Sequence, residues 1–437
     1  MLDGMLKPGE KLNSEKGVQY TVREMLGAGG QGEVYRIDSP NGPMALKWYY
    51  KQTSTENQKK IISDLVEDGS PSPQFLWPVD FINSKSNNTF GYVMGLRPRE
   101  YRNIPDLLNR RVQVSFDVVI KAVYNMVEQF EILHREGYSY KDISDQNVFF
   151  HPQTGDILIC DNDNVSKNNQ DDSGVYGTMR YMAPEIVRGD QGVHPSTKTD
   201  LYSMAVLMFC MMFISHPLDG ATEAGIHALD DAANRALYGT KPVFIYDPVN
   251  KKNRPVKGIH DNALLFWEIY PSFLKDKFIV AFTKGLFSPA ERIVEREWKD
   301  TLISLMNSTI ICPYCGAEVF YDEKKEGNGT GNVCWHCRSS IQKPSIMQIG
   351  RHMLPVSSSL KIKSHHLNND YDLGTIEASV SQNPKNPSQK GLKNEGKSNW
   401  TYIRNDGTQQ IVPPGRSAAL VPGIKINFGN ITGEYKN

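Results

Sequence analysis

The chain has 437 residues, with 49 Lys plus Arg and 49 Asp plus Glu, so its formal net charge at pH 7 is zero. This length predicts two or three domains with ample sequence for a large core. The charge balance excludes bulk electrostatic attraction to nucleic acid or to a membrane surface, so neither is expected as a partner.

The ends and apolar stretches of the chain bear on its location. Residues 1–8 lack the apolar core of a signal peptide. The longest apolar stretch, residues 205–214, is shorter than a membrane span and favours a buried core helix. We therefore expect a cytoplasmic protein.

The first hundred residues predict a small sheet with one helix. Apolar side chains in residues 55–67 recur on one helical face, and a Pro- and Gly-containing segment ends that helix. Gly-rich or Pro-Gly turns separate the predicted strands. These strands are expected at residues 20–26, 33–37, 44–49, 77–82 and 90–94.

The pattern turns helical beyond Asp106. Apolar residues recur at helix period from Val118 to Leu133, and residues 298–306 predict the last helix of a larger helical lobe. From about residue 345 the chain is rich in Asn, Gly and Pro and has short apolar strands, so we expect a small all-β domain there.

A glycine-rich hairpin is the first chemical motif. Gly27, Gly29 and Gly32 follow a predicted strand, and the next strand begins at Val34, so backbone amides can approach phosphates without obstruction by Cβ atoms. A dinucleotide-binding fingerprint would instead be followed by a helix. Taken alone, Lys47 on the third strand would be interpreted as an ordinary edge-strand lysine. Because it follows this hairpin in the chain, a role for Lys47 in binding phosphate is favoured.

Acidic and amide side chains form the second motif. Asp142 and Asn147 lie in Asp-Ile-Ser-Asp-Gln-Asn, and Asp161 and Asp163 follow a short apolar strand. Hard carboxylate and amide oxygens are the ligands that Mg²⁺ prefers. A solvated turn is the alternative interpretation of Asp161 and Asp163.

In this order, and together with Met44-Ala-Leu-Lys47 and Ala183-Pro-Glu185, the motifs resemble the protein kinase family over about residues 15–307. The resemblance implies a bilobal α+β fold that uses ATP and Mg²⁺. It assigns Lys47 to the α- and β-phosphates, Asp142 to the substrate hydroxyl, and Asn147 and Asp161 to Mg²⁺.

The same resemblance implies a partner for Lys47, two structural contacts in the helical lobe and the remaining nucleotide contacts. Glu56 is ranked ahead of Glu67 as the carboxylate that pairs with Lys47, Asp200 anchors the catalytic loop, and Arg292 pairs with Glu185. The expected nucleotide-binding residues are Gly27, Gly29, Gly32, Val34, Ala45, Lys47, Glu56, Met94, Gly95 and Leu96.

Three departures concern control of the reaction. Tyr140-Lys141 replaces the usual His-Arg before the catalytic aspartate, and lysine is a weaker partner for a phosphate than arginine. Ser144 replaces the usual phosphate-binding lysine, which leaves the choice between Ser/Thr and Tyr substrates open, with Ser/Thr preferred. Asp161-Asn162-Asp163 lacks the Phe and Gly of the family motif, which argues against ordinary in/out switching.

Four cysteines predict a structural metal site in residues 308–343. Cys312 and Cys315 form one CxxC pair, and Cys334 and Cys337 form a second after 18 residues. This spacing is typical of a tetrahedral Zn²⁺ site, and four sulfur ligands leave no open position for catalysis.

Residues 345–437 resemble, more loosely, a forkhead-associated β-sandwich. The resemblance rests on Gly350-Arg351, Ser364-His-His and Asn399-Trp-Thr. It implies that Arg351, Ser364 and Asn399 bind a phosphothreonine peptide or a phosphorylated segment of the chain itself. A generic β-sandwich with an ordinary surface arginine is the alternative.

The sequence therefore predicts an ATP-dependent protein kinase that acts on protein hydroxyls and phosphorylates itself near Ser173, Tyr176 or Thr178, with zinc and phosphopeptide modules. A pseudokinase scaffold without catalysis is the main alternative. A small-molecule kinase is the second alternative. The Ala-Pro-Glu segment argues against this alternative, because that segment implies a shelf for a peptide substrate.

Overall fold

The computed structural model describes residues 4–84, 89–168, 177–327, 329, 331–368, 370–383 and 386–437. They form two compact units: one comprises Met1–Trp267 and Lys275–Lys299, and the other Glu268–Leu274 and Asp300–Asn437. No helix within the described ranges is long and apolar enough to cross a membrane.

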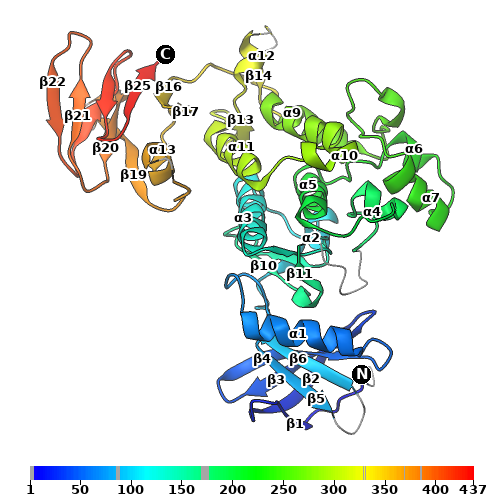
Figure 1. Ribbon diagram of the computed structural model, residues 1–437. Coiled ribbons are helices and arrows are strands. Elements are labelled where there is room, and N and C mark those ends of the chain that lie inside the picture. The colour runs from blue at the N-terminus through cyan, green and yellow to red at the C-terminus, as the bar shows by residue number, and fades with distance from the viewer. Residues whose placement is uncertain are drawn as a thin grey trace. The chain divides into compact units, whose positions relative to one another are not determined.

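The amino-terminal lobe of the first unit is a β-sheet with one helix. Its elements are β1 (Lys11–Asn13), β2 (Gln19–Ala28), β3 (Gly32–Ser39), β4 (Gly42–Tyr49), α1 (Glu56–Asp68), β5 (Asp80–Ser84) and β6 (Thr89–Gly95). The strands pair in the order β1-β2-β3-β4-β6-β5. Helix α1 lies across this sheet (Figure 1) because Ile62 packs with Tyr49, Phe81 and Phe90.

A helical lobe follows, most of which belongs to the first unit. Helix α5 runs through its core, where residues 199–213 are all buried, as expected for the apolar stretch. Helix α3 packs against it. The elements are β7 (Arg102–Asn103), α2 (Ile104–Leu108), α3 (Phe116–Arg135), β8 (Tyr138–Ser139), β9 (Val148–Phe150), β10 (Ile157–Ile159), η1 (Asn162–Asn164), β11 (Ser166–Lys167), α4 (Pro184–Arg188), α5 (Thr197–Phe213), α6 (Ala221–Ala224), α7 (Asp231–Arg235), η2 (Ala236–Thr240), η3 (Lys251–Asn253), α8 (Asp261–Ile269), α9 (Ser272–Ala281), α10 (Lys284–Phe287), η4 (Pro289–Glu291) and α11 (Glu295–Ser308).

After α11, the second unit contains two small hairpins that carry the four cysteines. Strands β12 (Thr309–Ile311) and β13 (Glu318–Phe320) pair around the first CxxC segment, and β14 (Asn332–Val333) and β15 (Ser340–Ile341) pair around the second. The short helix α12 (Glu323–Gly327) lies between the hairpins in the chain.

The described residues from Ile346 to Lys436 form strands and one short helix, α13 (Ser364–Asn368). One sheet has the order β17-β16-β25-β24-β21-β22 and the other β18-β19-β20-β23. Side chains of both sheets, such as Ile349 and Leu392, share one core, so the sheets form a sandwich. Its strands are β16 (Ile346–Ile349), β17 (His352–Pro355), β18 (Lys361–Lys363), β19 (Ile376–Asn383), β20 (Asn386–Asn394), β21 (Trp400–Ile403), β22 (Gln409–Val412), β23 (Ser417–Ala419), β24 (Lys425–Asn427) and β25 (Thr432–Lys436).

Candidate active site

The glycine-rich segment forms the turn between β2 and β3. The amide of Gly29 donates to the carbonyl of Gly32 at 2.8 Å and closes the hairpin. A Cβ atom on Gly32 would lie 2.2 Å from the carbonyl oxygen of Trp48, so only glycine allows β3 this close to β4. Gly27 and Gly29 have open space beside them, which leaves room for a ligand.

Gln31 ties the tip of this hairpin to the rest of the site. Its carbonyl accepts from the Tyr50 amide at 2.9 Å and from the Thr53 hydroxyl at 2.5 Å. Its side-chain oxygen accepts from Lys47 Nζ at 2.9 Å, and its amide nitrogen donates to Asn164 at 3.3 Å. No feature of the sequence pointed to Gln31, because the motif specifies only the glycines around it.

Lys47 lies on β4 with its side chain only 6% exposed. Its ammonium is 2.7 Å from Asp163 Oδ2 and 3.4 Å from Asp161 Oδ1. Burial lowers the pKa of Lys47, but the charges and hydrogen bonds of Asp163 and Asp161 outweigh burial and raise that pKa above its usual value. Lys47 is therefore a charged group at the hairpin base.

Glu56, expected as the partner of Lys47, occupies a different position. It is exposed at the first turn of α1, and the partners of Lys47 are the two aspartates. The α1 residue that faces inward is Gln58, which is buried and donates to the Asp163 carbonyl at 2.8 Å. The capping of α1 by Thr55 sets this register, which turns Glu56 toward solvent.

The loop between β8 and β9 holds Asp142 in place. Asp142 Oδ1 accepts from the amide and the hydroxyl of Thr178, each at 2.8 Å, and Oδ2 accepts from Asn147 Nδ2 at 3.1 Å. The buried Asp200 accepts from the amides of Tyr140 and Lys141 at 2.6 and 3.0 Å, as expected for the anchor of this loop. Ser173 and Tyr176 lie outside the described residues.

The donor set around Asn147 and Asp161 fits Mg²⁺. Asn147 uses its amide nitrogen on the carbonyl and carboxylate of Asp142, which leaves the amide oxygen available as a ligand. Asp161 follows β10 with a left-handed backbone, φ 51°, and its side chain remains 44% exposed. A half-exposed carboxylate and an amide oxygen are suitable ligands for a hard cation.

A cavity of about 590 Å³ adjoins these groups, within the size range of small-molecule sites. Among the predicted residues, Gly27, Val34, Ala45, Met94, Gly95 and Leu96 line it, as do Asn147 and Asp161. Gly29, Gly32, Lys47 and Glu56 are not among the lining residues. Sequence reasoning missed Leu76, Phe149 and Cys160, which also line the cavity.

A profile of the family described as "Protein kinase domain" matches residues 20–261, more than half of the chain. The chain belongs to the protein kinase family. The kinase has the expected pair between Arg292 and Glu185, at 2.8 Å, behind the Ala-Pro-Glu segment.

The curated relatives of this kinase are distant. The serine/threonine-protein kinase PkaB of Streptomyces coelicolor is 23% identical over 225 residues, which are 47% of this chain and 51% of that protein. The dual specificity protein kinase Ttk of Danio rerio is 24% identical over 237 residues, 50% of this chain and 23% of Ttk. The serine/threonine-protein kinase pkn3 of Myxococcus xanthus is 22% identical over 227 residues, 47% and 40% of the two chains. The matches span about half or less of these relatives.

The four cysteines of the kinase chain converge. All four sulfur atoms lie within 4.8 Å of one another, with Cys312 3.7 Å from Cys337 and Cys315 3.6 Å from Cys334. Zn–S bonds of about 2.3 Å in a tetrahedron place sulfurs about 3.8 Å apart, so the cluster has dimensions suitable for zinc.

Two of the three residues expected to bind a phosphopeptide have other partners. Arg351 donates two hydrogen bonds to Asp300, at 2.8 and 3.1 Å. Ser364 is buried and donates to Asp370 at 2.8 Å, whereas Asn399 is exposed before β21. The Asp300 carboxylate thus engages Arg351 in the bidentate manner in which a phosphate could.

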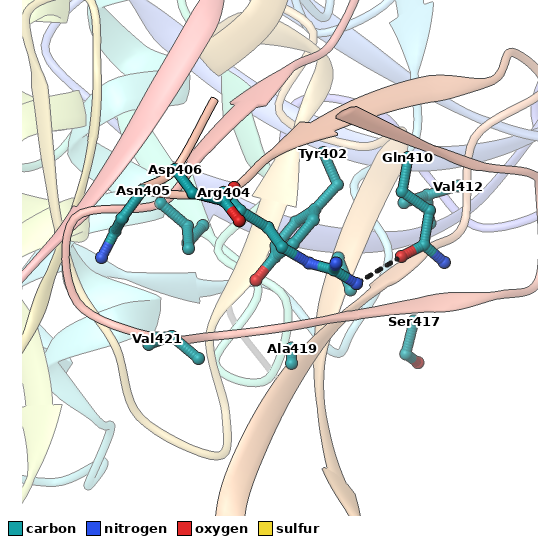
Figure 2. Close-up of a pocket in the computed structure, with 11 residues that line it drawn as sticks. Tyr402, Arg404, Asn405, Asp406, Gln410, Val412, Ser417, Ala419 and Val421 are labelled. Carbon is teal, nitrogen blue, oxygen red and sulfur yellow. Dashed lines mark hydrogen bonds between the residues drawn. The ribbon is translucent and has the colours of Figure 1, made fainter. Parts of the chain in front are cut away.

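A separate cavity of about 590 Å³ lies in the same sandwich (Figure 2). It is lined by side chains of β21, β22 and β23 and of the turns beside them. Arg404 donates to Gln410 at 3.2 Å within it. Arg351, Ser364 and Asn399 do not line this cavity, so it is distinct from the expected phosphopeptide site.

Proposed function

We propose that the protein is an ATP- and Mg²⁺-dependent kinase that phosphorylates protein hydroxyl groups, with Ser/Thr preferred over Tyr. The observation that carries this proposal is that Asn147 and Asp161 line one cavity, while Asp142 accepts a hydrogen bond from Asn147 and Lys47 is paired with Asp161. A pseudokinase has no need of an oriented Asp142, whereas here three hydrogen bonds hold that carboxylate.

Each residue of the site has a distinct role in phosphate transfer. Val34, Ala45 and the segment around Gly95 enclose the base, and Lys47 binds phosphate oxygens. Asp142 orients the substrate hydroxyl and accepts its proton. Asn147 and Asp161 hold Mg²⁺, which when bound neutralises charge on the phosphates. Rate enhancement then comes mainly from positioning and charge neutralisation.

A protein substrate is favoured over a small molecule by the segment after Thr178. Met179 and Met182 pack against a buried cluster formed by Val187, Leu218 and Tyr238. The Glu185–Arg292 pair fixes the end of this segment. An ordered apolar shelf beside Asp142 suits a peptide chain that must lie in extended form.

The test is phosphate transfer from γ-labelled ATP with Mg²⁺. Label is expected on the wild-type chain and to be lost in Asp142→Ala and Lys47→Met, because each removes a group that acts in transfer. Asp156→Asn, which alters an exposed carboxylate before β10, should label normally. Absence of label from the wild-type chain and from a panel of acceptor proteins would favour the pseudokinase alternative.

Two further parts of the proposal concern the second unit. We assign a structural Zn²⁺ to the four-cysteine cluster, supported by its sulfur separations. We also assign phosphothreonine recognition to the sandwich through Arg351, Ser364 and Asn399, with the phosphate taking the place of the Asp300 carboxylate that Arg351 binds in its absence. The forkhead-associated fold, the boundaries at residues 307, 343 and 345, and the cytoplasmic location remain predictions.

A further inference from the structure

The strongest unexplained feature of the active site is the buried carboxylate of Asp163. Its side chain is fully buried, and its Oδ2 lies 2.7 Å from Lys47 Nζ. The same carboxylate accepts a hydrogen bond from the buried Tyr49 hydroxyl. A buried carboxylate is costly unless a charge is paired with it, so Asp163 and Lys47 each compensate the burial of the other.

The short helix η1 fixes this carboxylate in place. Asn162 is fully buried and donates to the carbonyls of Leu76 and Ile159, at 2.9 and 3.1 Å. Gln58 of α1 donates to the carbonyl of Asp163 at 2.8 Å and to Tyr49 Oη at 3.3 Å. The backbone and side chain of Asp163 are thus held from α1, β4 and the β10 region.

The other two partners of Lys47 are more accessible than Asp163. Asp161 is 3.4 Å away and 44% exposed, and Gln31 belongs to the turn of the hairpin. An ammonium group has three hydrogens to donate. A nucleotide phosphate can therefore replace Gln31 or Asp161 at Lys47 while the pair with Asp163 persists.

We infer that Asp163 is the positioning residue for Lys47, taking the part of a helix-borne glutamate, so that Lys47 is oriented by the metal-binding loop and not by α1. This inference rests on the proposed kinase function. Because α1 contributes a neutral Gln58 and its Glu56 is exposed, a movement of α1 alone does not remove the charge partner of Lys47.

The test compares Asp163→Asn with Glu56→Gln and with Asp64→Asn, an exposed carboxylate of α1. Asp163→Asn keeps the shape but removes the charge, so we expect KM for ATP to rise about 10-fold and kcat to fall at least about 10-fold. Glu56→Gln and Asp64→Asn should match the wild type. Misfolding alone lowers kcat through the active fraction and leaves KM unchanged.

A second variant guards against loss of folding. Tyr49→Phe keeps the ring and the Asp163 charge but removes the hydrogen bond to Asp163 and the one accepted from Gln58, so it should raise KM for ATP by about 2- to 5-fold. The inference would be overturned if KM for ATP were unchanged in both Asp163→Asn and Tyr49→Phe, or if it rose in Glu56→Gln alone.

Calorimetric binding of MgADP separates this inference from the proposed function. If the wild type binds MgADP but transfers no phosphate, and Asp163→Asn binds about 10-fold more weakly, the inference stands and the proposed function fails. If transfer occurs and Asp163→Asn binds as the wild type does, the inference fails alone. A wild type that binds no nucleotide overturns both.

Discussion

His134 at the end of α3 joins two carboxylates inside the helical lobe. Its Nε2 lies 3.2 Å from Asp200 Oδ2, and its Nδ1 contacts Glu295. Burial lowers the pKa of His134, but the hydrogen bonds and charges of Asp200 and Glu295 outweigh it and raise the pKa to about 9. The imidazolium thus neutralises the carboxylate that anchors the catalytic loop.

The stability of the chain should depend on this charge. The pKa of His134 is about 9 in the folded chain and 6.5 in the unfolded chain. Protonation of His134 therefore stabilises the fold, with its full contribution below pH 6.5, and this contribution is lost as the pH rises through 9. Its size is on the order of 3 kcal/mol. Thermal melts of the wild type and His134→Gln should therefore differ most near pH 6 and converge above pH 9.5; a difference independent of pH would contradict the assignment.

At the scale of single residues, the sequence predicted the groups that a motif specifies. Asp142, Asn147 and Asp161 could be predicted because their spacing is set by one short loop and one hairpin, and their roles stay predictions. The partner of Lys47 was misplaced because it depends on which side chain of α1 turns inward and on the backbone of η1. Neither is determined by spacing along the chain.

Among the elements, the two cysteine hairpins repeat one backbone pattern. The amide of Cys312 donates to the Ala317 carbonyl and that of Cys334 to the Ser339 carbonyl, at 2.8 and 2.9 Å. The fourth residue after each of these cysteines has positive φ: Gly316 at 76° and Arg338 at 63°. Only the first hairpin has the residue that adopts this conformation without strain.

This asymmetry predicts a stabilising substitution. Arg338→Gly should bind zinc more tightly, by an amount corresponding to about 1 kcal/mol, because the left-handed backbone no longer strains a side chain. Gly316→Ala should bind it more weakly by a similar amount. Competition with a chromophoric chelator measures both. Arg338→Lys keeps charge and strain and serves as the control; equal affinities of the Gly and Lys variants would refute the argument.

Strands and helices with a strong period were predicted closely. The expected helix at residues 55–67 is α1 at Glu56–Asp68, and the expected strand at residues 44–49 lies within β4. The strand expected at residues 77–82 begins later, at Asp80, and the segment before it, from Gln74 to Leu76, pairs instead with Ile159, the last residue of β10. That pairing joins distant parts of the chain, so local pattern cannot show it.

For the whole molecule, the two units predict separable activities. Asp142→Ala should abolish phosphate transfer and retain binding of a phosphothreonine peptide, whereas Arg351→Ala should do the reverse, because the two side chains lie in different compact units. Transfer assays and fluorescence anisotropy measure the two activities. A variant that loses both activities while remaining folded would show that one unit depends on the other.

The boundary between the two units falls within a helix. Helix α11 runs from Glu295 to Ser308, whereas the first unit ends at Lys299. The sequence predicted one helix here but could not predict that residues of that helix belong to both units, since burial in a core depends on packing. A truncation placed at this boundary would cut a continuous helix.

The six cysteines have one further consequence, for thiol chemistry. Burial raises the pKa of Cys160 in the active-site cavity and of Cys210 in α5 to about 12, so both are protonated and poor nucleophiles at neutral pH. The other four are ligands once zinc is bound. A reagent that counts reactive sulfhydryl groups should then find almost none in the native protein and four after chelation, so alkylation becomes a direct gauge of metal occupancy.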